Sequence, residues 1–269
     1  MNAQSTIELR SGSKMPVMGL GTWQLTGDDA VSSAAYALEI GYRMIDTSSD
    51  YRNHEQIGRA IRDSLIPRQD IYLVTKVEED DNSYEAVKEY LGQLGMNYAD
   101  LILIHRPPSR DVGTDLWKGL VQAKQEGLTR DIGISNYSID QIEELIKSTG
   151  VTPVVNQIEW SPFGFSKEML RYCRSKDIII QAYSPLTRQG RLDEGPIVEL
   201  AEKYGKTPAQ IMIRWDLQHK VVPIVKATSR EHLEENIDVF DFSIGNDDIA
   251  RLDDLNEHYS SLGRKPLYV

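Results

Sequence analysis

Four residues with acid–base side chains stand at or near the ends of short apolar runs. Asp46, Lys76 and His105 each close such a run, and Tyr51 follows shortly after Asp46. A phenol keeps its proton until about pH 10 unless a nearby cation stabilises the phenolate. Lys76 can supply that cation, Asp46 can keep it charged and oriented, and His105 can donate a hydrogen bond to a carbonyl oxygen. Together the four side chains suit protonation of an oxygen on which negative charge develops.

Taken alone, each of these residues has an ordinary structural explanation. A strand-terminal Asp often caps a loop, a Lys there often reaches solvent, and a Tyr at the rim of a fold often packs with its hydroxyl in water. Their joint placement favours a shared site, because the chemistry of a barrel of parallel strands lies at the carboxyl ends of those strands.

The apolar runs belong to a regular series that begins near Val17. Short apolar runs alternate with amphipathic stretches, and this pattern is typical of repeated strand-then-helix units with parallel strands. Eight such units without a Gly/Ser/Pro-rich linker predict an α/β fold, a (β/α)8 TIM barrel in which residues 1–269 form a single domain. The expected strands are residues 17–20, 43–46, 71–76, 101–105, 131–135, 154–159, 178–182 and 221–225. The expected helices are 28–40, 55–65, 84–94, 116–125, 139–147, 167–174, 208–217 and 231–239.

Three segments fall outside these eight units. Residues 7–9 and 14–16 flank the sequence Arg-Ser-Gly-Ser, which predicts an N-terminal β-hairpin that caps one end of the barrel. Residues 247–256 predict an extra C-terminal helix, and residues 195–205 a short helix before the one that starts near Thr207.

The composition excludes several classes of function. The chain has 269 residues, 40% hydrophobic and 26% charged, which is typical of a folded globular protein. Its net charge of -11 disfavours nucleic acid and anionic membranes as partners. With one cysteine, Cys173, five scattered histidines, no signal pattern and no membrane-spanning run, we expect a cytoplasmic protein without a disulfide or a metal site.

Further motifs occur in a characteristic order along the chain. They are Gly19-Leu20-Gly21-Thr22-Trp23, residues 46–58, Leu103-Ile104-His105, residues 132–137, Asn156-Gln157 and Ala182-Tyr183-Ser184-Pro185. With this set, the sequence resembles the aldo-keto reductase superfamily from the N-terminal hairpin to near Asn236. The resemblance implies reduction of aldehydes or ketones to alcohols by hydride transfer from NAD(P)H, without a metal, on a barrel.

The resemblance also implies roles for individual residues. Tyr51 becomes the general acid, Lys76 and Asp46 the pair that tunes it, and His105 a donor that orients the substrate. The cofactor-binding residues that it implies are Gly21, Thr22, Asp46, Ser135, Asn136, Gln157, Tyr183, Ser184, Leu186, Lys226, Thr228, Ser229, Arg230, Glu235 and Asn236. Within this set, Ser135, Asn136 and Gln157 would bind the nicotinamide carboxamide, and Tyr183 would stack on the ring.

Two departures from the family pattern concern the adenine end of the cofactor. Ala227 replaces a usual serine, and His232 replaces the usual arginine that binds the 2′-phosphate. Lys226, Thr228 and Arg230 can still bind that phosphate at the start of the following helix. The expected cofactor is therefore NADP(H), with NAD(H) as the alternative.

A third departure concerns the substrate. Arg106 follows the catalytic histidine where many relatives have tryptophan, and a cation there can favour carboxylated or polar substrates or turn outward into solvent. Trp23, Tyr51, His105 and Arg106 are the expected substrate contacts. Loops of moderate length predict an open pocket and broad specificity for small polar carbonyl compounds.

Two other functions are alternatives to carbonyl reduction. Lys76 could form a Schiff base, as lysines at barrel strand ends do in aldolases, although Asp46 should keep it charged and non-nucleophilic. A nucleotide-sensing subunit with little chemistry is the second alternative, and the retention of all four acid–base residues disfavours it. We expect a monomer, with a dimer as the alternative.

Overall fold

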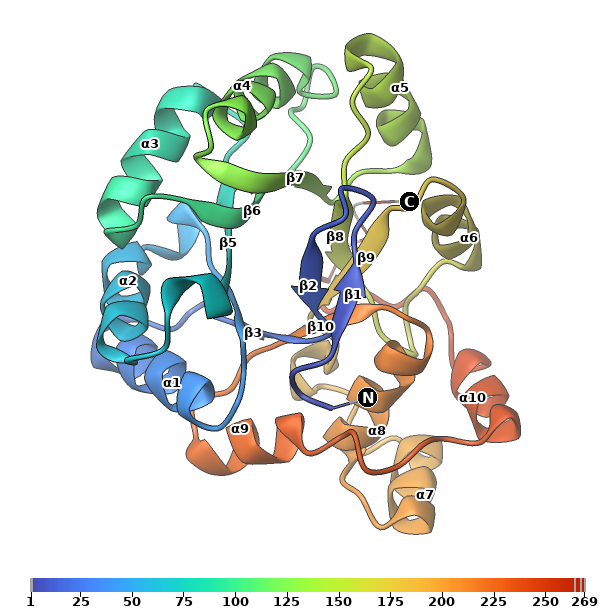
Figure 1. Cartoon of the computed structure of the whole chain (residues 1–269). Coiled ribbons are helices and arrows are strands. Elements are labelled where there is room, and N and C mark those ends of the chain that lie inside the picture. Colours follow the sequence, from blue (N-terminus) through green and yellow to red (C-terminus); the bar gives the residue numbers. More distant parts are fainter. Residues whose placement is uncertain (1, 264, 267, 269) are drawn as a thin grey trace.

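The computed structural model describes residues 2–263, 265, 266 and 268, and its central feature is a closed barrel of eight parallel strands (Figure 1). The first strand of the barrel, β3, pairs with its sequence neighbour β4 and with the last strand, β10, which closes the ring. The strands are β3 (Gly19–Gly21), β4 (Met44–Asp46), β5 (Tyr72–Val77), β6 (Ala99–Ile104), β7 (Thr129–Ser135), β8 (Val155–Glu159), β9 (Ile179–Tyr183) and β10 (Val222–Val225). All eight overlap the expected ranges, so the predicted barrel is confirmed.

A ring of helices surrounds the strands (Figure 1). Eight of them alternate with the strands, namely α1 (Gly27–Glu39), α2 (His54–Asp63), α3 (Ser83–Leu94), α4 (Thr114–Gln125), α5 (Ile139–Thr149), α6 (Lys167–Ser175), α8 (Pro208–Gln218) and α9 (Arg230–Ile237). The predicted extra helices are also present, as α7 (Gly195–Tyr204) and α10 (Asn246–Asp253). Short 3-10 turns are η1 (Ser49–Tyr51), η2 (Arg68–Asp70) and η3 (Thr187–Gln189).

The N-terminal hairpin closes one end of the barrel. Its strands are β1 (Thr6–Glu8) and β2 (Lys14–Pro16), joined by a turn in which Gly12 has a φ of +85°. The Ser13 hydroxyl donates to the buried carboxylate of Asp131 near the start of β7, and Met15 is fully buried among residues of the barrel strands. The predicted hairpin cap is thus confirmed, and the structure shows that it covers the amino-terminal ends of the strands and leaves their carboxyl ends open.

Apolar packing inside and outside the sheet fixes the positions of the strand ends. The barrel interior is filled by side chains such as Met44, Val74, Leu103 and Ile224, and two larger clusters occupy the space between strands and helices. Gly58 lets α2 approach α3 closely, because a Cβ there would lie 1.9 Å from the backbone oxygen of Leu94.

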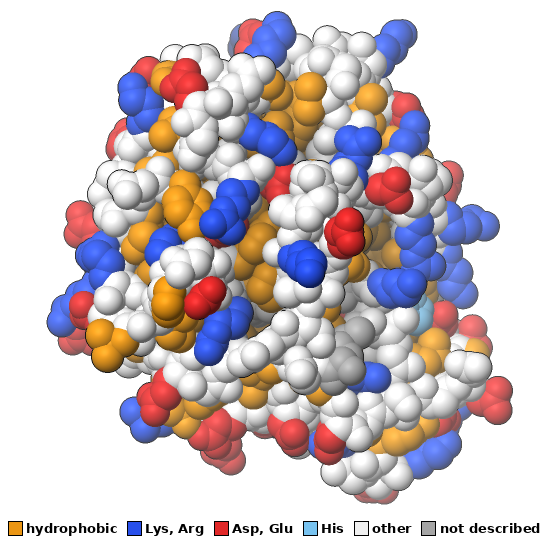
Figure 2. All heavy atoms as spheres, in the orientation of Figure 1, with side chains coloured by type: hydrophobic (Ala, Val, Ile, Leu, Met, Phe, Trp, Pro, Cys, Tyr) orange, Lys and Arg blue, Asp and Glu red, His pale blue; other side chains and the backbone are white. Residues whose placement is uncertain are grey.

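The surface on the hairpin side has mixed character. Figure 2 shows basic and acidic side chains interspersed with separate hydrophobic patches. Within the described residues, no helix is long and apolar enough to cross a membrane.

Candidate active site

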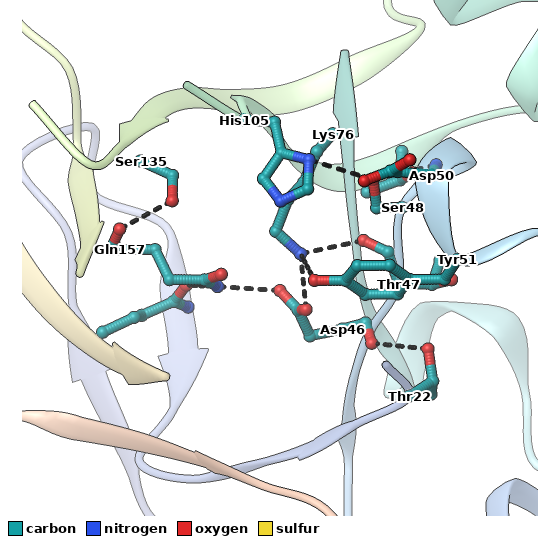
Figure 3. Close-up of polar contacts among 12 residues, drawn as sticks. Thr22, Asp46, Thr47, Ser48, Asp50, Tyr51, Lys76, His105, Ser135 and Gln157 are labelled. Carbon is teal, nitrogen blue, oxygen red and sulfur yellow. Dashed lines mark hydrogen bonds and ion pairs between the residues drawn. The ribbon is translucent and has the colours of Figure 1, made fainter. Parts of the chain in front are cut away.

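Three of the four predicted acid–base residues form a linked group around a buried ammonium (Figure 3). Lys76 Nζ lies 2.6 Å from Asp46 Oδ1, 3.0 Å from the backbone oxygen of Thr47 and 3.3 Å from the phenol oxygen of Tyr51. Strands β4 and β5 are neighbours, and η1 begins three residues after Asp46, so short connections bring these side chains together. All three N–H groups of the ammonium therefore face oxygen atoms.

The ionisation of Lys76 and Tyr51 follows from burial and from these contacts. Burial alone would lower the pKa of Lys76, but the charge and hydrogen bond of Asp46, with Tyr51, reverse this effect and raise the pKa. Burial raises the pKa of Tyr51, and Lys76 offsets that effect only in part. The expectation that the cation lowers the phenol pKa below its usual value is thus wrong, because the effect of burial exceeds that of Lys76.

The fourth residue, His105, follows β6 and has a hydrogen-bonded carboxylate partner that was not expected from the sequence. Its Nδ1 lies 2.9 Å from Oε1 and 2.8 Å from Oε2 of Glu78, just beyond the end of β5. The His105 ring also meets the Tyr51 ring edge-on, with centroids 6.0 Å apart. The alternation of side chains along a strand could have suggested Glu78, since it follows Lys76 by two residues.

A cavity of about 620 Å³ opens at the carboxyl ends of the strands. Most of the predicted site residues line it: Gly21, Thr22, Trp23, Asp46, Tyr51, His105, Arg106, Ser135, Asn136, Gln157, Tyr183, Ser184, Leu186, Lys226, Thr228, Glu235 and Asn236. Three do not line it. Lys76 lies beneath the wall, Ser229 caps α9 by accepting from the His232 backbone N–H, and Arg230 stacks on Tyr36 with its guanidinium 4.4 Å from the ring centre.

One wall of the cavity is a network of amide and hydroxyl groups. Ser135 Oγ donates to the backbone oxygen of Gln157 at 2.7 Å, and Tyr183 donates to Asn136 Oδ1 at 2.8 Å. Gln157 Nε2 donates to Asp46 Oδ2 at 2.8 Å and to Gln181 Oε1 at 3.0 Å. Because both hydrogens of this amide are used, Gln157 offers a ligand its carbonyl oxygen.

Two cationic side chains, Arg188 and Lys226, line the end of the cavity near α9. The Arg188 guanidinium lies 4.4 Å from the centre of the Trp23 ring, and Lys226 Nζ lies 5.7 Å from it. Burial and the charge of Arg188 lower the pKa of Lys226. His232 lies 3.3 Å from Glu235. Sequence analysis did not single out Arg188, which lies in η3, a turn whose residues all have positive φ.

Arg106 lies at the mouth of the cavity beside two carboxylates. Its Nη2 is 3.2 Å from Asp50, and its Nη1 is 3.6 Å from Glu79. The Arg106 guanidinium therefore lines the cavity, and its positive charge is paired with two carboxylates.

The barrel and the acid–base group at the open ends of its strands define a class of barrel enzymes, and sequence comparison identifies the family. A family model described as "Aldo/keto reductase family" matches residues 17–257. The chain belongs to this family and is an oxidoreductase.

Relatives and solved structures cover nearly the whole chain. It is 38% identical to methylglyoxal reductase DkgA of Escherichia coli (strain K12), and 38% identical to glyoxal reductase of Bacillus subtilis (strain 168), with 94% of each chain covered in both comparisons. An aldo-keto reductase of Bombyx mori, solved in complex with NADP, aligns with a TM-score of 0.90 and 31% identity over 97% of this chain and 95% of that one. An aldo/keto reductase of Brucella melitensis aligns with a TM-score of 0.89 and 39% identity, covering 94% of this chain and 99% of that one.

Proposed function

We propose that the protein reduces aldehydes or ketones to alcohols with NADP(H), and that Tyr51 is the general acid. The observation that carries this proposal is the hydrogen-bonded series from Asp46 through Lys76 to Tyr51, whose phenol faces the cavity. His105 lines the cavity beside Tyr51, so a carbonyl oxygen placed there would meet two groups able to stabilise developing negative charge.

The residues of the cavity fit a nicotinamide dinucleotide. The amide wall offers the Gln157 carbonyl oxygen at the end near Tyr51, while Lys226 and Arg188 supply cations farther along. Each of these two cations lacks a carboxylate partner among the described residues, which suits phosphate groups. NADP(H) is the favoured cofactor, as in the Bombyx mori relative, and NAD(H) is the alternative because His232 replaces arginine. When bound, the cofactor supplies the hydride.

Proton delivery is the task of the chain itself. The raised pKa of Tyr51 keeps the phenol protonated at neutral pH, so the proton is available when the carbonyl oxygen gains charge. After transfer, the adjacent Lys76 ammonium stabilises the phenolate, and Asp46 holds that ammonium in place. The partial shielding of this group from water strengthens each of these interactions.

The substrates that the site favours are small, polar and uncharged carbonyl compounds. Asp50 and Glu79 offset the charge of Arg106, which removes the expected advantage of carboxylated substrates. The two bacterial relatives are named for glyoxal and methylglyoxal, which are compounds of this kind. Trp23 and Leu262 add apolar surface to the cavity, and broad specificity remains part of the proposal.

The Schiff-base alternative conflicts with the geometry. A lysine attacks a carbonyl only through an unprotonated nitrogen. Lys76 is held as an ammonium by Asp46, and its three hydrogens point to the oxygens of Asp46, Thr47 and Tyr51.

We extend the proposal to the setting in which the protein works. Residues 1–269 act as one domain, as a cytoplasmic monomer with small carbonyl compounds as partners. Cys173 acts as a structural residue and not as a redox-active one, since its thiol is buried and burial raises its pKa to about 12.

The experiment that tests the proposed function is oxidation of NADPH and NADH followed by absorbance with glyoxal, methylglyoxal and a panel of aromatic aldehydes. We expect turnover with these aldehydes, faster with NADPH at low nucleotide concentration. A folded protein that binds nucleotide but oxidises it with no carbonyl in the panel would contradict the proposal.

A further inference from the structure

The pair formed by Glu78 and His105 adds a charge to the site that the acid–base group predicted from the sequence lacks. We propose that Glu78 is a positioning residue that holds His105 as an imidazolium, so that a full positive charge faces the carbonyl oxygen of the substrate. This proposal rests on the proposed function.

The hydrogen bond between the two residues determines which ring nitrogen carries a proton. Both carboxylate oxygens of Glu78 lie within 2.9 Å of His105 Nδ1. An ionised carboxylate only accepts hydrogen bonds, so Nδ1 carries the hydrogen. A neutral ring in that state has a bare Nε2, which cannot donate to a carbonyl oxygen. Donation from Nε2 therefore requires the doubly protonated, cationic ring.

Glu78 is ionised and held in place by its surroundings. Burial alone would raise its pKa, but the hydrogen bond and charge of His105, the Ser48 hydroxyl and the charge of Arg106 lower it to about 2. Ser48 Oγ donates to Oε1 at 2.8 Å, and Ser49 Oγ does so at 3.2 Å. The Glu78 backbone N–H donates to Asp81 Oδ2 at 2.8 Å, which fixes the start of the loop. The carboxylate thus meets the ring in one orientation without reorganisation.

The other charged and titratable groups around His105 come from two elements and from its own loop. From η1 come Asp50, whose carboxylate lies within 4.8 Å of the Glu78 oxygen and the His105 nitrogen, and the neutral phenol of Tyr51. From β5 comes Lys76, whose charge is balanced by Asp46 at 2.6 Å. Arg106 follows His105 and is paired with Asp50 and Glu79.

These groups leave an excess of negative charge beside the ring. The two cations, Lys76 and Arg106, each have carboxylate partners of their own, whereas Glu78 has the imidazole and two hydroxyl groups. A cationic ring is the state that neutralises this excess.

A Glu78 carboxylate that holds His105 as a cation affects kcat in a way that a purely structural role for Glu78 would not. Aldehyde reduction should slow as pH rises and His105 loses its second proton. Replacing Glu78 by Gln removes the charge that holds this proton, so the alkaline decline of kcat should move to lower pH. At neutral pH we expect kcat to fall about tenfold or more, the size of a general acid–base or oxyanion contribution, with NADPH affinity unchanged.

The test combines nitrogen-15 NMR of the histidine side chains with pH profiles of kcat for methylglyoxal reduction by the full chain. The variants are Glu78→Gln and, as a matched control, Glu85→Gln, an exposed carboxylate that pairs with Lys88. In the wild type at neutral pH, the NMR signals of His105 should show both nitrogens protonated, and in Glu78→Gln a neutral ring at the same pH. Glu85→Gln should match the wild type in both measurements.

Two results would overturn the inference. One is a neutral His105 ring in the wild type at neutral pH, and the other is a Glu78→Gln profile that coincides with that of Glu85→Gln. The NMR measurement on the wild type stands even if Glu78→Gln does not fold. It also separates this inference from the proposed function, because a cationic His105 without carbonyl turnover would contradict only the latter.

Discussion

Lys76 Nζ lies 3.3 Å from the phenol oxygen of Tyr51, and the lysine side chain is completely buried. A buried cation next to a phenol has little effect while the phenol is neutral and a large one once the phenol has given up its proton. The contact therefore stabilises the phenolate of Tyr51 more than the neutral phenol. This difference is what the proposed role of Tyr51 as general acid requires.

Cofactor preference should respond to the residue at position 232. His232→Arg places a permanent cation beside the wall near Lys226, where it can bind a 2′-phosphate. We expect the KM for NADPH to fall about tenfold, equivalent to one charge-assisted hydrogen bond, while kcat and the KM for NADH stay the same. Steady-state kinetics with both nucleotides check this, and an equal change for NADH would place the 2′-phosphate elsewhere.

The charge at the mouth of the cavity should discriminate between glyoxal and glyoxylate, which differ by one carboxylate. Asp50 and Glu79 offset Arg106, so the wild type should have the higher kcat/KM with glyoxal. In Asp50→Asn with Glu79→Gln, the ratio should shift toward glyoxylate by about fivefold, as expected for about 1 kcal/mol between partly exposed charges. An unchanged ratio would show that Arg106 does not contact the substrate.

Two glycines of neighbouring helices should respond oppositely to substitution by alanine. A Cβ at Gly58 would lie 1.9 Å from the Leu94 backbone oxygen, whereas a Cβ at Gly92 on the exposed side of α3 meets nothing within 4 Å. We expect Gly58→Ala to lower the free energy of unfolding by about 2–3 kcal/mol through the forced separation of α2 and α3. Gly92→Ala should raise it by about 0.5–1 kcal/mol through helix propensity. Chemical denaturation measures the free energy of unfolding of both variants. Similar effects at the two positions would contradict the close contact of α2 with α3 at Gly58.

Asp216 in α8 should make the stability depend on pH. Both of its carboxylate oxygens are buried without a hydrogen-bond partner among the described residues, and burial raises its pKa well above the usual value. The native state therefore retains a proton that the unfolded chain releases above about pH 4, so stability falls as pH rises. Asp216→Asn should be more stable than the wild type by about 1–3 kcal/mol near pH 8, with a smaller difference near pH 4.

A matched control for that variant is Asp131→Asn. Asp131 is equally buried, but it pairs with Lys124 at 2.9 Å and accepts from Ser13. Its replacement should lower the stability at both pH values. If the effect of Asp216→Asn on the free energy of unfolding did not change with pH, the Asp216 carboxyl group would not be the cause of the pH-dependent stability.

Much of the fold could be predicted from the sequence because its signals are local. The alternation of apolar runs and amphipathic stretches located eight strands and eight helices, and hydrophobic burial on both sides of the sheet follows from that pattern. The hairpin was predicted from a turn that contains Gly12, whose φ of +85° favours glycine.

The contacts that sequence analysis missed are set by tertiary geometry. Glu78 and His105 meet because each follows one of two neighbouring strands, β5 and β6, and Arg188 reaches Trp23 from a distant loop. Alternation along a strand could suggest that Glu78 faces the site, but it does not identify His105 as its partner. The pKa of Tyr51 was predicted in the wrong direction for a similar reason, since the sequence shows the cation but not the extent of desolvation.

The measurement that tests the central claim most directly is single-turnover reduction of methylglyoxal by NADPH-loaded wild type and Tyr51→Phe. The variant removes only the phenol oxygen, and nucleotide binding measured by fluorescence verifies that the pocket is intact. We predict that the rate of hydride transfer falls by about 10²–10⁴-fold, the range for loss of a general acid, with nucleotide affinity preserved. Hydride transfer at the wild-type rate in Tyr51→Phe would contradict the assignment of Tyr51 as the proton donor.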